Sequence, residues 1–173
     1  MAGRARRVLA AFGVLAALAG LAVAIGAPMG LFSGSRPADL GSRNGTLRGG
    51  DGRPNWVSSQ VPASDAHHVA PLAVAGDADR GWKALEAAIA AEPRAAIVTS
   101  RPGYLHAEFS SKAMGFVDDA EFVLDRGAGL IHVRAGARLG IRDFGVNRAR
   151  VERLRAALVP FSLPSSSPLP PPG

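Results

Sequence analysis

An unbroken apolar run near the N-terminus constrains this chain more than any other feature of its sequence. From Val8 to Ala27 no side chain is polar, and the next charged residue is Arg36. A helix of about 20 residues spans the roughly 30 Å hydrocarbon core of a bilayer. Three arginines lie before the run, and positive charge marks the cytoplasmic end of a membrane helix. The pattern therefore predicts one membrane helix with the N-terminus inside and the remaining chain on the opposite side.

A cleaved signal peptide is the alternative interpretation of the same run. Ala22-Val23-Ala24 resembles a small-x-small cleavage site, and the many alanines and glycines make the run only moderately apolar. Against cleavage, the apolar segment of a signal peptide is usually about 7–15 residues long, which is shorter than this run. Both interpretations carry the folded part across the membrane. Only the interpretation as a membrane helix leaves the folded part anchored in the membrane, through residues 8–27.

The formal net charge of +6 comes mostly from segments that precede the folded part. Three N-terminal arginines and the arginine-rich residues 36–53 hold most of the excess, and residues 54–158 are nearly neutral. Within that part, residues 54–125 are acidic and residues 126–155 are basic, which predicts internal ion pairs. Few aromatic side chains lie among these arginines, so we expect no nucleic-acid partner. The chain has no cysteine, which excludes disulfides, thiolate metal sites and a cysteine nucleophile.

Changes in composition divide the chain into four parts. Residues 1–32 hold the apolar run, and the glycine-rich residues 33–53 predict a linker arm. Residues 54–159 carry the helical and strand-like patterns of a folded domain. Residues 160–173 contain six prolines and four serines, a composition that predicts a disordered tail.

Two helical patterns enclose four strand-like runs in the folded part. Asp79 and Asn147 are the expected N-caps of the helices, and Pro93 and Pro160 end them. The connections between the runs are too short for parallel crossovers, so the sheet is expected to be antiparallel. Because the last three runs alternate apolar and polar side chains, the helices would cover one face. The sequence predicts an α+β two-layer sandwich, with a four-stranded or slightly larger sheet built from residues 95–100, 104–111, 116–125 and 130–135.

The uncovered face of this sheet is polar, and any chemistry would lie there. Its imidazole and carboxylate groups suit zinc or manganese, or general acid–base catalysis. The alternative is a solvated face with charges paired across strands. The sequence has no phosphate-binding loop, nucleophile elbow or His-Glu-x-x-His motif, and we expect no resident metal or cofactor. The enzyme hypothesis rests on His106, Glu108, Glu121 and His132, with Asp119 and Arg134 on the same face.

Arginines are frequent between residues 134 and 150, near acidic side chains of the third strand-like run. Guanidinium groups bind carboxylates and phosphates in a bidentate manner. One hypothesis is therefore a ligand or protein partner held by arginines that nearby carboxylates orient. The other is that these groups pair with each other and stabilise the turn before the second helix. The ligand hypothesis names Arg134, Arg138 and Arg148 as contacts and Asp118, Asp119 and Glu121 as orienting groups.

Several stretches together resemble a bacterial family known as domain of unknown function 1499. They are residues 36–41, Pro54-Asn55-Trp56-Val57-Ser58-Ser59-Gln60, residues 115–122, and residues 134–148, so the resemblance covers about residues 36–158. It implies a short secreted or membrane-anchored protein, here on the periplasmic side of the bacterial cytoplasmic membrane, and it implies no reaction. It also implies a cysteine pair at the positions of Gly50 and Trp56, and this chain has neither cysteine.

These observations favour a membrane-anchored envelope domain that binds a small-molecule ligand or a protein partner without catalysis. The alternative is an extracytoplasmic hydrolase or metal-dependent enzyme that uses the polar sheet face.

Overall fold

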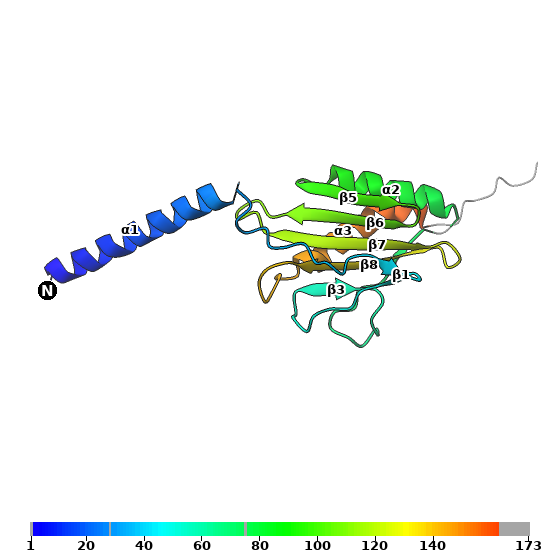
Figure 1. Cartoon of the computed structure of the whole chain (residues 1–173), viewed down its shortest axis with the longest axis horizontal. Helices are drawn as coiled ribbons and strands as arrows, with labels where there is room; N and C mark the ends of the chain where they lie inside the picture. The colour runs from blue at the N-terminus through cyan, green and yellow to red at the C-terminus, as the bar shows by residue number, and fades with distance from the viewer. Residues whose placement is uncertain (1, 28, 75, 163–173) are drawn as a thin grey trace, which may run out of the picture.

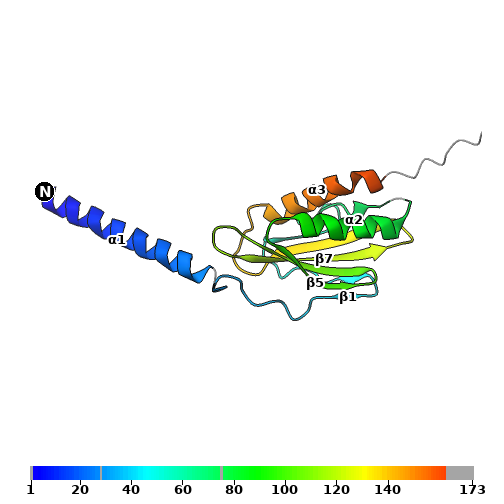
Figure 2. The same ribbon diagram turned by 90° about the horizontal axis from the view of Figure 1, so that it is seen from above.

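A long apolar helix leads into an α+β domain in the computed structural model, which describes residues 2–27, 29–74 and 76–162 (Figure 1). Helix α1 (Ala2–Gly26) extends away from the domain in both views (Figures 1 and 2). Its segment Arg4–Gly26 is long and apolar enough to cross a membrane, and none of its most apolar part is buried in the protein. A helix that is apolar on all sides needs an apolar environment. The helix thus has the character of a membrane anchor or a signal sequence.

Six strands form one antiparallel sheet in the order β3-β8-β7-β6-β5, and β4 also pairs with β8. The four long strands are those expected from the sequence, each within two residues of its expected ends. The short strands β3 and β4 were not predicted, because two or three residues show no periodicity. The predicted α+β fold class is confirmed. The strands are β3 (Trp56–Ser58), β4 (Leu72–Ala73), β5 (Ala95–Arg101), β6 (Tyr104–Ser110), β7 (Val117–Asp125) and β8 (Leu130–Ala137).

Helices α2 (Ala78–Ala91) and α3 (Val146–Leu158) lie side by side on one face of the sheet (Figure 2). This face is the one that the alternation of side chains predicted. The main core fills the space between the helices and the strands. It includes Trp82, Leu85, Ile89, Leu105, Ala107, Phe109, Ala120, Phe122, Ile131, Val133, Val151, Leu154 and Leu158.

Both helices begin earlier than the sequence suggested. The N-cap of α2 is Asp77, whose carboxylate accepts hydrogen bonds from the backbone N–H groups of Asp79 and Arg80. The prediction that Asp79 caps the helix was wrong, because Asp77 offers the same carboxylate two residues earlier. At α3, Asp143 accepts from the N–H of Asn147, so the expected cap is itself inside the helix.

A short 3-10 helix, η1 (Val159–Phe161), follows α3 at Pro160. Only the first three residues of the tail expected at 160–173 belong to the described part of the chain. The other eleven lie outside the described residues.

Residues 33–53, which we call the arm, lie across the polar face of the sheet (Figure 1). Strands β1 (Ser42–Arg43) and β2 (Thr46–Leu47) form a two-stranded hairpin within it. Leu47 is buried against Tyr104 and Val123 in a small second core. The polar face is therefore covered rather than solvated, and its central side chains are buried.

Gly50, near the end of the arm, packs against the indole of Trp56. A Cβ placed on Gly50 would overlap the indole ring. The opposite side of the ring stacks on His67, with ring centroids 4.1 Å apart. The two positions at which the family resemblance implied a cysteine pair are thus in contact, and in this chain a glycine and a tryptophan make that contact.

Candidate functional site

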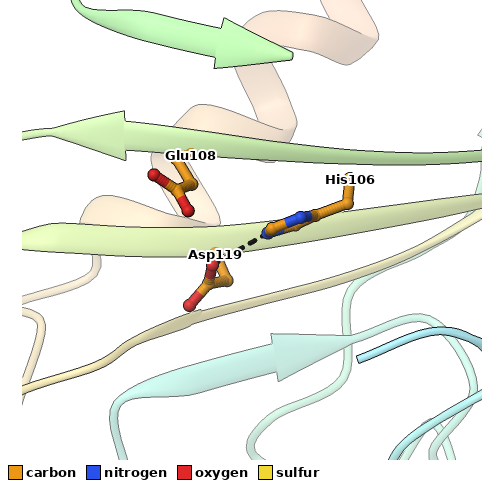
Figure 3. Close-up of side chains that lie close together, drawn as sticks. All are labelled: His106, Glu108 and Asp119. Atoms are coloured by element: carbon orange, nitrogen blue, oxygen red, sulfur yellow. Dashed lines mark hydrogen bonds and ion pairs between the residues drawn. The ribbon is translucent and has the colours of Figure 1, made fainter. Parts of the chain in front are cut away.

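Three of the predicted site residues lie together on the polar face, beneath the arm (Figure 3). His106 and Glu108 come from β6, and Asp119 comes from β7 opposite Glu108. His106 Nε2 and Asp119 Oδ1 share a hydrogen bond of 2.8 Å. Each residue offers one potential metal-ligand atom, and these atoms lie within 4.8 Å of one another. By distance alone, this group could surround a metal ion.

Arginine side chains already occupy the carboxylate oxygens of this group. Arg138 donates from Nε to Asp119 Oδ2 at 2.8 Å and from Nη2 to Asp119 Oδ1 at 2.7 Å, and it also pairs with Glu108. Arg36, from the arm, donates to Glu108 Oε1 at 2.7 Å. A divalent cation would have to displace one guanidinium and lie beside another. The donor set fits a closed network of ion pairs and does not fit a metal site.

The protonation behaviour of these groups follows from the pairing. Burial by itself raises the pKa of Asp119, but hydrogen bonds from Arg138 and His106 outweigh burial, so its pKa is lowered. The pKa of Glu108 is lowered in the same way, with Arg138 and Arg36 outweighing burial. Hydrogen bonding to Asp119 and Glu108 raises the pKa of Arg138. Both carboxylates are therefore held ionised, which suits an ion pair and does not suit a general acid.

Glu121 and Arg134 form the neighbouring part of the covered face, opposite each other on β7 and β8. Glu121 Oε1 accepts hydrogen bonds from the Tyr104 hydroxyl at 2.8 Å and from the Gly41 N–H at 2.6 Å. Burial and Glu121 together raise the pKa of Tyr104. Burial, with a contribution from Arg48, lowers the pKa of Arg134. Glu121 Oε2 and two nitrogens of Arg134 are buried without a protein partner among the described residues, so a water molecule there would gain hydrogen bonds.

Two other predicted site residues lie apart from this group. His132 is half-buried on β8, and its Nδ1 lies 3.3 Å from Ser59 Oγ. Arg148, on α3, donates to the backbone carbonyls of His68 at 2.6 Å and Ala66 at 2.7 Å. Arg148 therefore holds the loop that carries Ala66 and His68. The fold does not bring His106 and His132, the two histidines of the enzyme hypothesis, into one cluster.

A large cavity lies elsewhere, at the end of the domain next to α1. Its volume is about 1170 Å³. It is lined by residues of the β6–β7 turn, the β8–α3 loop, the segment after α2 and the first half of α3. Its apolar wall consists of Phe109, Phe116, Leu139, Ile141, Phe144 and Val146. Sequence reasoning missed this site; the available signal was two bulky apolar residues between Gly140 and Gly145, where turn residues are usually polar.

Two ion pairs lie among the charged groups of this cavity. Asp118, one of the predicted orienting residues, accepts a 2.8 Å hydrogen bond from Arg150 Nη2. The Cζ atom of Arg150 lies 4.3 Å from the ring centroid of Phe109, a cation–π contact at the cavity wall. Burial raises the pKa of Asp118, although Arg150 opposes the shift. Arg153 and Glu92 form a second ion pair at 3.0 Å. The cavity thus combines an apolar wall with two ion pairs. Three further charged residues line it and form no salt bridge within the described part of the chain: Arg94, Arg142 and Asp143.

The cavity wall touches the residues that follow α1. The rings of Phe32 and Phe116 meet edge to face, with centroids 6.2 Å apart. Gly34 lies so close to Leu139 that an added Cβ would be 2.9 Å from its side chain. Gly115 lies beside the carbonyl of Ala27. The mouth of the cavity is therefore next to the point where the chain leaves the apolar helix.

Comparison with known proteins identifies the family of this chain. No curated protein and no solved structure matches it. One family model, described as a protein of unknown function (DUF1499), matches residues 50–158, which is more than half of the 173 residues. The resemblance noted in the sequence is thereby confirmed, and the chain belongs to the DUF1499 family.

Proposed function

We propose that this protein is a membrane-anchored binding protein of the bacterial envelope. Its domain lies on the extracytoplasmic side, and the cavity of about 1170 Å³ holds the apolar part of an amphiphilic ligand. The observation that carries the proposal is the position of this apolar cavity beside the residues that leave α1. An amphiphile dissolved in the same bilayer can reach such a cavity without crossing water.

The anchor argument rests on the apolar helix and its flanks. From Val8 onward α1 is apolar and largely exposed, so a bilayer is the environment that stabilises it. The arginines at its start favour a cytoplasmic N-terminus. The domain then lies outside, with the cavity at the level where α1 reaches the membrane surface.

The choice of binding over catalysis rests on the state of the charged groups. Ligand sites are usually apolar clefts of about 300–1,000 Å³ with a few placed polar groups, and the cavity is of this kind. Two of its carboxylates, Asp118 and Glu92, are each paired with an arginine, and Asp143 accepts hydrogen bonds from the backbone. The cluster of His106, Glu108 and Asp119 lies under the arm and is neutralised by Arg138. No observation favours an enzyme at either place.

Photo-crosslinking of bilayer lipids tests this proposal. The full chain is reconstituted in phosphatidylglycerol–phosphatidylethanolamine vesicles that contain a phospholipid with a diazirine in its acyl chain. After irradiation, the modified peptides are mapped by mass spectrometry. We expect adducts on α1 and also on the cavity wall outside the β8–α3 loop, for example in the segment that carries Phe109. The intact mass of the adduct also shows whether α1 is retained.

A cavity-filling variant supplies the matched comparison. Ala137 lines the cavity, so Ala137→Phe fills part of it, whereas Ala128→Phe changes an exposed turn at the other end of the domain. Relative to the adducts on α1, adducts on the cavity wall should fall several-fold in Ala137→Phe and remain unchanged in Ala128→Phe. Adducts confined to α1 in every variant would overturn the proposal.

A further inference from the structure

The β8–α3 loop, residues 139–146, exposes a group of apolar side chains at one edge of the cavity. Phe144 is 94% exposed and Ile141 is 72% exposed, and Leu139 and Val146 are also exposed. Single exposed apolar residues are ordinary on protein surfaces. Four within eight residues, continuous with an apolar cavity, form a patch of the kind that marks an interaction surface.

The loop is held in this conformation by the protein. Asp143 accepts hydrogen bonds from the N–H groups of Gly145 and Asn147 at 3.1 and 3.0 Å. Asn55 donates to the carbonyl of Gly140 at 2.8 Å. Phe144 has a φ angle of 52°, a left-handed conformation that a bulky side chain rarely adopts. The fold therefore presents this ring to the outside at a conformational cost, instead of turning it inward.

The position of the loop identifies the bilayer as its partner. Leu139 lies against Gly34, and Phe116, which also lines the cavity, contacts Phe32. Both views show the loop at the end of the domain from which α1 departs (Figures 1 and 2). Arg142 lies exposed between the two most exposed apolar residues. Apolar side chains with an arginine among them match the interface between acyl chains and anionic headgroups.

We infer that residues 139–146 insert into the surface of the bilayer that holds α1, with Ile141 and Phe144 among the acyl chains and Arg142 at the headgroups. The insertion places the mouth of the cavity against the membrane. This inference deepens the proposed function, because it supplies the entry by which a bilayer amphiphile reaches the cavity.

Site-specific fluorescence tests the insertion on the full chain. The protein has no cysteine, so Phe144→Cys gives a single labelling site for the fluorophore NBD. The labelled chain is reconstituted in phosphatidylglycerol–phosphatidylethanolamine vesicles, and quenching by lipids with a nitroxide on the acyl chain is measured. Ile141→Cys is a second, independent position. Ala128→Cys, in the exposed β7–β8 turn at the end opposite α1, is the matched control.

We expect the lipid nitroxide to quench the label at positions 141 and 144 at least about threefold more than at position 128, with a blue-shifted emission. Equal quenching at all three positions would overturn the inference, whatever else contacts the loop. The two proposals fail separately. A quenched label without lipid adducts in the cavity contradicts only the binding function, and cavity adducts with an unquenched label contradict only the insertion.

Discussion

Two regions of the domain, the covered polar face and the cavity beside α1, are built in opposite ways. The covered polar face holds the residues with the most reactive chemistry, and the arm and Arg138 close it with ion pairs. The cavity beside α1 has a largely apolar wall, and its edge exposes large apolar side chains. The first region pairs most of its charges within the protein, although Glu121 Oε2 and two nitrogens of Arg134 have no partner among the described residues. The second leaves large apolar side chains exposed.

The contrast shows that chemically reactive side chains do not identify a functional site by themselves, because such side chains can be paired with each other inside the protein. A carboxylate or guanidinium can be buried only when another charge or hydrogen bond compensates it. Asp119 and Arg138 meet this condition with each other, and nothing is left for a substrate. Exposed apolar surface has no such internal compensation. It is stable only where something else covers it, and here the membrane is adjacent.

The largest effect expected is from breaking the covered network. Arg138→Met removes a partner of the buried Asp119 and of the half-buried Glu108, and breaking a buried ion pair costs about 3–5 kcal/mol. Denaturant unfolding of the full chain in detergent, followed by tryptophan fluorescence, measures the loss. Arg142→Met, at the exposed loop, is the control and should change the free energy of unfolding by less than about 0.5 kcal/mol. Similar effects for both variants would show that the two regions do not differ as described.

A smaller effect is expected where the arm meets Trp56. Gly50→Ala puts a methyl group into the indole, and overpacking of this kind typically costs about 1–3 kcal/mol. Gly49→Ala is the matched control, because a Cβ there has no neighbour within 4 Å. The same unfolding measurement separates the two. Equal stability of both variants would mean that the end of the arm is free to move away from the ring.

The sequence predicted the elements and faces of the domain better than it predicted the site. Strand alternation such as Leu105-His106-Ala107 is a local signal, and it identified the core face correctly. Whether His106 meets water or Asp119 depends on register and on the arm, and both are set by contacts between distant residues. The arm itself resembled a linker because glycine-rich segments lack periodicity. The cavity was missed because Ile141 and Phe144 look like core residues until the fold leaves them exposed.

The smallest effect on stability is expected at the edge of the cavity, and it separates the two regions most clearly. Phe144→Asn removes a ring that is 94% exposed, so little packing is lost. Asparagine also accepts the left-handed conformation at φ 52° more readily than phenylalanine does. The free energy of unfolding should therefore stay within about 0.5 kcal/mol of the original or rise slightly. Lipid adducts on the cavity wall should nevertheless decrease, because the loop loses its most exposed apolar group. A large loss of stability in this variant would show that the ring serves packing, and the edge of the cavity would then belong with the covered face as part of the structural framework.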